Sequence, residues 1–168
     1  MTRRAVFFKW LLYALAAAAI VLLQNLILTH LNIAGVHPFL LPAVTAVPAT
    51  RESRRESLLF AFAFGLLCDL SIPAPFPCLY AVSFLLIALL SGLVARRLVN
   101  PGLVCSLTVS AAAMLITDLL RILSISGTPG FHLSAALLLT LHELAVTVIF
   151  FPAVHMLDHL VYRRMVNE

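Results

Sequence analysis

The stretch TRESRRESLLFAFAFGLLCDL, residues 50–70, decides the fold. It begins with a polar segment, 51–56, and continues as an apolar run that ends at Asp69 and Leu70. A second apolar run, which carries three prolines, precedes it at 34–50. Arginine and lysine gather in the cytoplasmic turns of membrane proteins. The stretch therefore predicts a short cytoplasmic turn between two membrane spans.

Composition supports a membrane protein along the whole chain. Of 168 residues, 62% are hydrophobic and 11% are charged, whereas soluble domains average about 25% charged residues. Helices of ~20 residues with short connections use nearly the whole length, so we expect a single membrane domain without a soluble catalytic domain. The predicted fold is an all-α bundle of six transmembrane helices, at 10–29, 34–50, 57–70, 78–95, 103–125 and 133–160.

The basic residues favour six spans. With a cytoplasmic N-terminus, ten of the eleven lysines and arginines lie in the cytoplasm, and Arg121 is the exception. If 34–50 did not cross the membrane, only three of them would stay inside. The positive-inside bias therefore predicts a multi-pass membrane protein with both termini in the cytoplasm. The net charge of +4 indicates contact with anionic lipid rather than nucleic acid.

The second span is short and contains Pro38, Pro42 and Pro48. Proline is tolerated in a membrane helix where neighbouring groups satisfy the freed carbonyls. A proline-interrupted segment can also mark a binding site. The sequence is therefore compatible with two interpretations of this span, a kinked structural helix and a binding segment.

Four ionisable residues lie inside the predicted spans: Asp69, Asp118, Arg121 and Glu143. Asp118 and Arg121 are three residues apart and share one helix face. Counted along their helices, the three acids fall in the central-to-outer half of the membrane. We hypothesise that they share a polar patch with Arg121 as the counter-ion, in which at least one acid is protonated or faces water. Such a patch is either a ligand or partner site or a polar network that fixes helix packing.

Small residues predict close helix packing. Gly65 precedes Asp69 by four residues, so both lie on one face, where a backbone can approach the glycine and bond to the acid. Ala14 and Ala18 give the first span a flat face. Packing within the bundle explains such a face, and a docking surface for a partner is the alternative.

Motifs of catalysis, metal binding and cofactor binding are not found. His142-Glu143 lacks the second histidine of a zinc-protease helix, and no G-x-S-x-G or phosphate-binding glycine loop occurs. His155 and His159 have metal-ligand spacing, but no third ligand is near in sequence. Cys68 and Cys78 could form a disulfide near the outer face, although cysteine is commonly a small buried hydrophobe. We expect no enzyme activity, no metal and no cofactor.

The stretch from Leu58 to Leu70 resembles the G-F-x-x-G-L-x-x-D motif of the rod shape-determining protein MreD family. Gly65 and Asp69 match this motif, whereas Ala61 or Phe62 replaces its first glycine. The small size, the six spans and the basic turns also fit. The resemblance implies a non-catalytic scaffold subunit of the cell-elongation (peptidoglycan synthesis) machinery. Its partners would be MreC and, with it, MreB, RodA and a class B penicillin-binding protein.

The MreD fold is similar to that of the substrate-binding subunits of energy-coupling-factor vitamin transporters, and these supply the alternative function. Such subunits also have six helices, an outer ligand site and a small-residue face on the first helix. The outer loops here offer few aromatic and polar residues for holding a vitamin. Asp69, Asp118, Arg121 and Glu143 could still provide convergent hydrogen-bonding groups.

Overall fold

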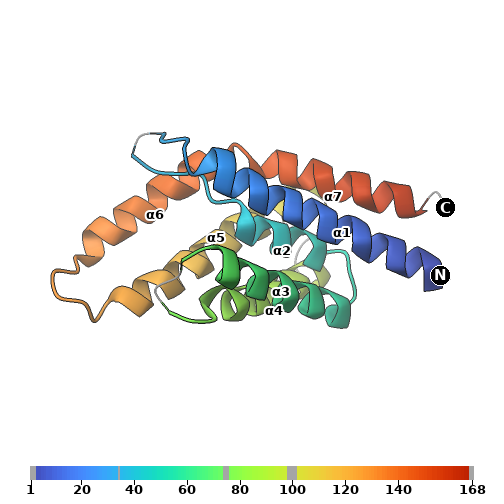
Figure 1. Ribbon diagram of the computed structural model, residues 1–168, viewed down its shortest axis with the longest axis horizontal. Coiled ribbons are helices and arrows are strands. Elements are labelled where there is room, and N and C mark those ends of the chain that lie inside the picture. The colour runs from blue at the N-terminus through green and yellow to red at the C-terminus, as the bar shows by residue number, and fades with distance from the viewer. Residues whose placement is uncertain (1–2, 34, 74–75, 98–101, 167–168) are drawn as a thin grey trace.

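The computed structural model describes residues 3–33, 35–73, 76–97 and 102–166. Ala34, the first residue of the predicted second span, lies outside the described residues. The described part is helical and contains no strand, which confirms the all-α prediction. Its elements are α1 (Arg3–Leu23), the π-helical turn η1 (Gln24–Leu28), α2 (Leu41–Ala49), α3 (Arg54–Ser71), α4 (Leu79–Arg97), α5 (Leu103–Ile125), α6 (Leu133–Val148) and α7 (Phe151–Val166) (Figure 1).

Three of the described helical segments are long and apolar enough to cross a membrane: Phe8–Leu28, Leu79–Arg96 and Leu103–Ile125. A fourth is obtained if α6 and α7 are counted as one bent span. Their outer surfaces are apolar; the side chains of Leu15 and Leu22 on α1, for example, are each 59% exposed. Leucines in such positions are suited to lipid rather than water. The chain is therefore built as a membrane protein.

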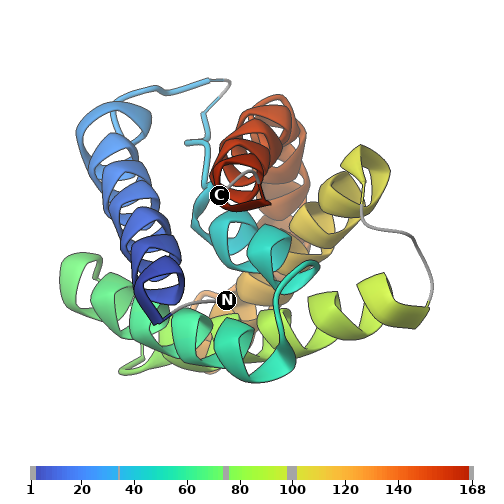
Figure 2. The ribbon, with the colours of Figure 1, turned by 90° about the vertical axis from the view of Figure 1, so that its right-hand side faces the viewer.

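The predicted second span, 34–50, is helical only over the nine residues of α2. Pro42 lies in the first turn of α2, where its missing N–H is tolerated, and the residue before a proline is disfavoured in a helix. A nine-residue helix is ~14 Å long, about half of the hydrocarbon core. All nine residues are buried, and α2 lies in the middle of the bundle (Figure 2), in contact with α1, α3, α4, α5 and α7.

The predicted last span, 133–160, is broken. Helix α6 ends at Val148, α7 begins at Phe151, and their axes differ in direction by 47°. Pro152 explains the break, because its ring would clash with the carbonyl of the residue four positions earlier in a continuous helix. The predicted span 133–160 therefore consists of two helices that can form one bent span.

The start of α1, the turn between α2 and α3, and the end of α7 lie at the same end of the long axis (Figure 1). A polar network joins them. Lys9 of α1 forms ion pairs with Glu52 in the turn and with Glu56 at the start of α3. Arg51 in the turn pairs with Asp158 of α7 at 3.3 Å. These contacts join α1, the turn and α7 at one end of the molecule.

Burial raises the pKa of Glu52 above its ordinary value, and the hydrogen bond and positive charge of Lys9 oppose this rise. The charged form of Glu52 therefore depends on Lys9. The turn also has a local anchor, since the Ser53 hydroxyl accepts a hydrogen bond from the Glu56 N–H at the start of α3. Ser53 and Glu56 have the spacing of a capping box.

An aromatic ladder runs through the core between the polar network and the other end of the molecule. Phe60 and Phe64 of α3 stack at a centroid distance of 5.8 Å, and Phe64 stacks on Phe84 of α4 at 5.6 Å. Phe84 contacts Tyr80, and Tyr80 contacts Phe39 at 6.1 Å. The ladder thus ends at a cavity, which is the candidate site.

Candidate functional site

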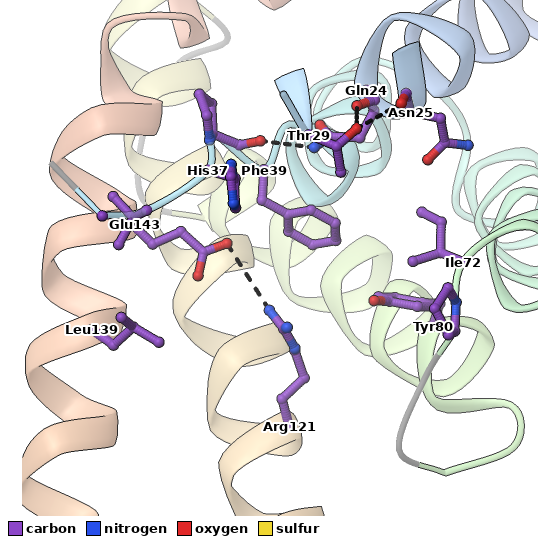
Figure 3. Close-up of a pocket in the computed structure, with 14 residues that line it drawn as sticks. Gln24, Asn25, Thr29, His37, Phe39, Ile72, Tyr80, Arg121, Leu139 and Glu143 are labelled. Carbon is purple, nitrogen blue, oxygen red and sulfur yellow. Dashed lines mark hydrogen bonds and ion pairs between the residues drawn. The ribbon is translucent and has the colours of Figure 1, made fainter. Parts of the chain in front are cut away.

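The candidate site is a cavity of about 290 Å³, here called the Arg121–Glu143 cavity. Its wall is made by η1, the segment before α2, the residues that follow α3, and side chains of α4, α5 and α6 (Figure 3). Ligand sites in bundles commonly lie between helices and combine an apolar lining with a few convergent polar groups. The polar lining residues with the greatest bearing on chemistry are Gln24, His37, Tyr80, Arg121 and Glu143.

Arg121 and Glu143 face each other across this cavity from α5 and α6 (Figure 3). The Arg121 Nη1 lies 4.0 Å from the Glu143 Oε1 and 3.5 Å from the Asp118 Oδ1. Its guanidinium carbon also lies 5.9 Å from the centre of the Phe39 ring, within the range of a cation–π contact. The Arg121 side chain is 41% exposed, whereas that of Asp118 is 4% exposed. The structure thus brings together three of the four residues of the hypothesised patch.

The fourth residue, Asp69, has a different partner. Its Oδ1 accepts a hydrogen bond from the Tyr80 N–H and its Oδ2 accepts one from the Ala81 N–H, each at 3.0 Å. These N–H groups lie in the first turn of α4, where they have no acceptor within the helix. Asp69 therefore caps α4 from α3, as a negative charge at a helix N-terminus should.

Gly65 supports the same helix pair. A Cβ atom built on Gly65 would lie 2.5 Å from the Ala81 Cα and 2.9 Å from the Tyr80 carbonyl oxygen. Only a glycine permits this approach of α3 to the backbone of α4. Gly65 and Asp69, which were expected to contact a partner backbone, thus hold two helices of this chain together.

Ala14 and Ala18 lie on an exposed strip of α1, while Ala17 between them faces the core. The packing of this chain therefore does not use the flat face that the sequence predicted. The strip remains accessible to another helix.

Gln24 lines the cavity and was not singled out by the sequence analysis. It is 4% exposed and lies in η1. Its Nε2 donates to the Pro38 carbonyl at 2.7 Å, and its Oε1 accepts from the Leu40 N–H at 3.1 Å. The π-helical turn is itself a signal, since such turns are frequent at functional sites, and the Gln24-Asn25 pair inside an apolar run could have indicated it.

Thr147 of α6 completes this support. Its hydroxyl accepts a hydrogen bond from the Phe39 N–H at 3.1 Å and donates to the Glu143 carbonyl at 2.7 Å. Gln24 and Thr147 together satisfy three backbone groups of the segment from Pro38 to Leu40. Non-helical backbone at membrane depth is stable only when it is buried and paired in this way.

The histidines and cysteines considered in the sequence analysis as possible metal ligands or disulfide partners lie outside this cavity. The Nδ1 of His155 is 2.8 Å from the Ser106 hydroxyl, and its ring stacks near His159. Within the described residues no three potential ligands gather in a group that could hold a metal ion. Cys68 and Cys78 are free thiols, the first buried and the second exposed.

Comparison with protein-family models, curated proteins and solved structures returned no match to this chain.

Proposed function

We propose that this chain is a non-catalytic scaffold subunit of the bacterial cell-elongation machinery, in the inner membrane, with MreC as its direct partner and MreB, RodA and a class B penicillin-binding protein in the same assembly. The resemblance of residues 58–70 to the MreD motif is the basis of this proposal. The observation that carries it is the geometry of that motif. Gly65 and Asp69 fix α3 against α4 by a backbone contact and a bidentate cap, and a rigid helical pair of this kind supports a scaffold role.

The proposed topology has six passes. The second pass consists of the segment 36–40, which is buried except for His37, followed by α2, and the sixth consists of α6 and α7 together. Four non-helical residues, 36–39, and ten residues with helical backbone, 40–49, reach at most ~29 Å in total, close to the thickness of a hydrocarbon core. The polar network that joins Lys9, Glu52 and Asp158 through ion pairs and the Tyr13 hydroxyl supports a common side for these ends.

Fusions truncated after Thr50 and after Asn100 test this topology. With a cytoplasmic N-terminus and six passes, a green fluorescent protein at either position should fluoresce, and alkaline phosphatase at either position should be inactive. A fusion truncated after Ser126 should give the opposite result and serves as the control. Active phosphatase after Thr50 would show that α2 does not complete a pass.

The partner surface in this proposal is the exposed strip of Ala14 and Ala18 on α1. Small residues let a partner helix approach closely in lipid. Ala19 is also exposed, but it lies about 100° further around the helix than Ala18. Ala19→Leu therefore adds the same bulk to the same helix on another face, which makes it a matched control.

Depletion of this chain from a rod-shaped host should round the cells. A plasmid copy that carries Ala14→Leu and Ala18→Leu should fail to restore rods and should lose co-purification with MreC, whereas Ala19→Leu should restore both. Membrane levels of each variant are measured by immunoblot. Rods that persist after depletion would contradict the proposal.

The alternative function is the substrate-binding subunit of an energy-coupling-factor vitamin transporter. The Arg121–Glu143 cavity favours it, because the cavity has a volume of about 290 Å³ and is lined by several polar groups. Unchanged rod shape together with the loss of uptake of one vitamin would establish the transporter instead.

A further inference from the structure

Two carboxyl groups meet one guanidinium at the Arg121–Glu143 cavity: Glu143 lines the cavity, and Asp118 contacts Arg121 without lining it. Arg121 is the one cation among the described residues that line it, and two carboxylates, Asp118 and Glu143, lie within 4.0 Å of its Nη1. The Asp118 Oδ2 is buried and has no hydrogen-bond partner among the described residues. With both carboxyl groups ionised, the cluster carries a net negative charge, which either a proton or a bound cation must balance in a medium of low dielectric constant.

Two acceptor groups of the cavity, the Glu143 carboxylate and the Tyr80 hydroxyl, make no hydrogen bond to a described residue, and the Asn25 side-chain amide also lines the cavity without one. Gln24, Thr29 and the Nδ1 of His37 are bonded to backbone groups. Within the described chain, by contrast, the Glu143 carboxylate makes only the 4.0 Å ion pair. The Tyr80 hydroxyl, which points into the cavity from α4 in Figure 3, makes no hydrogen bond to any described residue. Both groups can accept a hydrogen bond.

The apolar part of the cavity wall contains two aromatic rings and several aliphatic side chains. Phe39 and Tyr80 line the cavity with their ring centres 6.1 Å apart. Ile72 and Leu139 add aliphatic surface. A volume of about 290 Å³ admits a compact molecule of one ring with a short substituent.

We propose that this cavity binds a small organic cation, whose ammonium group donates to the Glu143 carboxylate and the Tyr80 hydroxyl while its planar body packs against Phe39 and Tyr80. An ammonium group has three donors and no acceptor, which matches two unoccupied acceptors. Its charge completes the balance of Asp118, Arg121 and Glu143. A carboxylate ligand would instead add a third negative charge beside one guanidinium. This assignment is independent of the scaffold function proposed above.

Three probes of one size test the assignment: benzylamine, benzyl alcohol and benzoate, which carry a positive, a neutral and a negative group on the same ring. Binding to the purified full-length protein in detergent is measured by calorimetry against empty micelles at neutral pH. Benzylamine should bind at one site, at least tenfold more tightly than the other two. Equal binding of benzylamine and benzyl alcohol, or preference for benzoate, would overturn the proposal.

Glu143→Gln keeps the shape of the side chain and removes its charge, so it should weaken benzylamine binding at least tenfold. Glu56→Gln removes a carboxylate at the opposite end of the bundle and should leave binding unchanged. Thermal unfolding verifies that both variants are folded, and the three-probe comparison on the unmodified protein needs no variant. Unchanged affinity in Glu143→Gln would refute the assignment, while the cell-shape experiment would be unaffected.

Discussion

Replacement of Gly65 by alanine should lower the free energy of unfolding by about 1–3 kcal/mol, the usual range for overpacking of a well-packed contact. The added Cβ would lie 2.5 Å from the Ala81 Cα and 2.9 Å from the Ala81 N, so the backbone of α4 must move away. This movement also stretches the two hydrogen bonds from the α4 N–H groups to Asp69. The decrease in the free energy of unfolding is measured by unfolding the purified protein in mixed micelles that contain an increasing fraction of a denaturing detergent.

Gly92→Ala is the matched control, because Gly92 is also a helical glycine at a helix contact. Its added Cβ would approach the Ala49 carbonyl oxygen at 3.3 Å, which a small shift can relieve. We expect an effect within about 1 kcal/mol, since the helical preference of alanine offsets the contact. If Gly65→Ala and Gly92→Ala lowered the free energy of unfolding equally, the α3–α4 contact at Gly65 would not be closer than an ordinary helix contact.

Replacement of Gln24 by leucine should destabilise the protein by roughly 2–4 kcal/mol, because it leaves two buried backbone groups unpaired at ~1–3 kcal/mol each. The side chain is similar in size, so packing is largely kept. The Pro38 carbonyl and the Leu40 N–H would lose their partners. The segment before α2 should then open, which hydrogen exchange of the Leu40 amide and detergent unfolding both detect.

Asn25→Leu provides the comparison, since Asn25 is the exposed neighbour of Gln24 and its side chain makes no hydrogen bond within the described structure. Its effect on the free energy of unfolding should stay within ~0.5 kcal/mol, as for most surface substitutions. If Gln24→Leu were as mild as Asn25→Leu, water or another side chain would have to satisfy the extended segment, and Gln24 would not be its support.

Local periodicity explains which parts of the candidate site the sequence could predict. Asp118 and Arg121 are three residues apart on a regular helix, so their contact follows from helix geometry alone. Glu143 joins them from another helix, and for that contact the sequence supplied only a similar predicted depth in the membrane. Asp69 had a similar depth as well, but its carboxylate caps α4 instead. Depth along a helix axis does not specify which neighbour a side chain faces.

The sequence by itself determined the helical class, the apolar surfaces and the gathering of basic residues at one end, because hydrophobicity and helix propensity act along the chain over a few turns. Only the tertiary structure decided that α2 is a short central helix, that Gln24 pairs with the segment before it, and that Gly65 touches the backbone of α4. These features depend on which backbone polar groups lack a partner and how closely two helices approach. Both are set by contacts between segments distant in sequence.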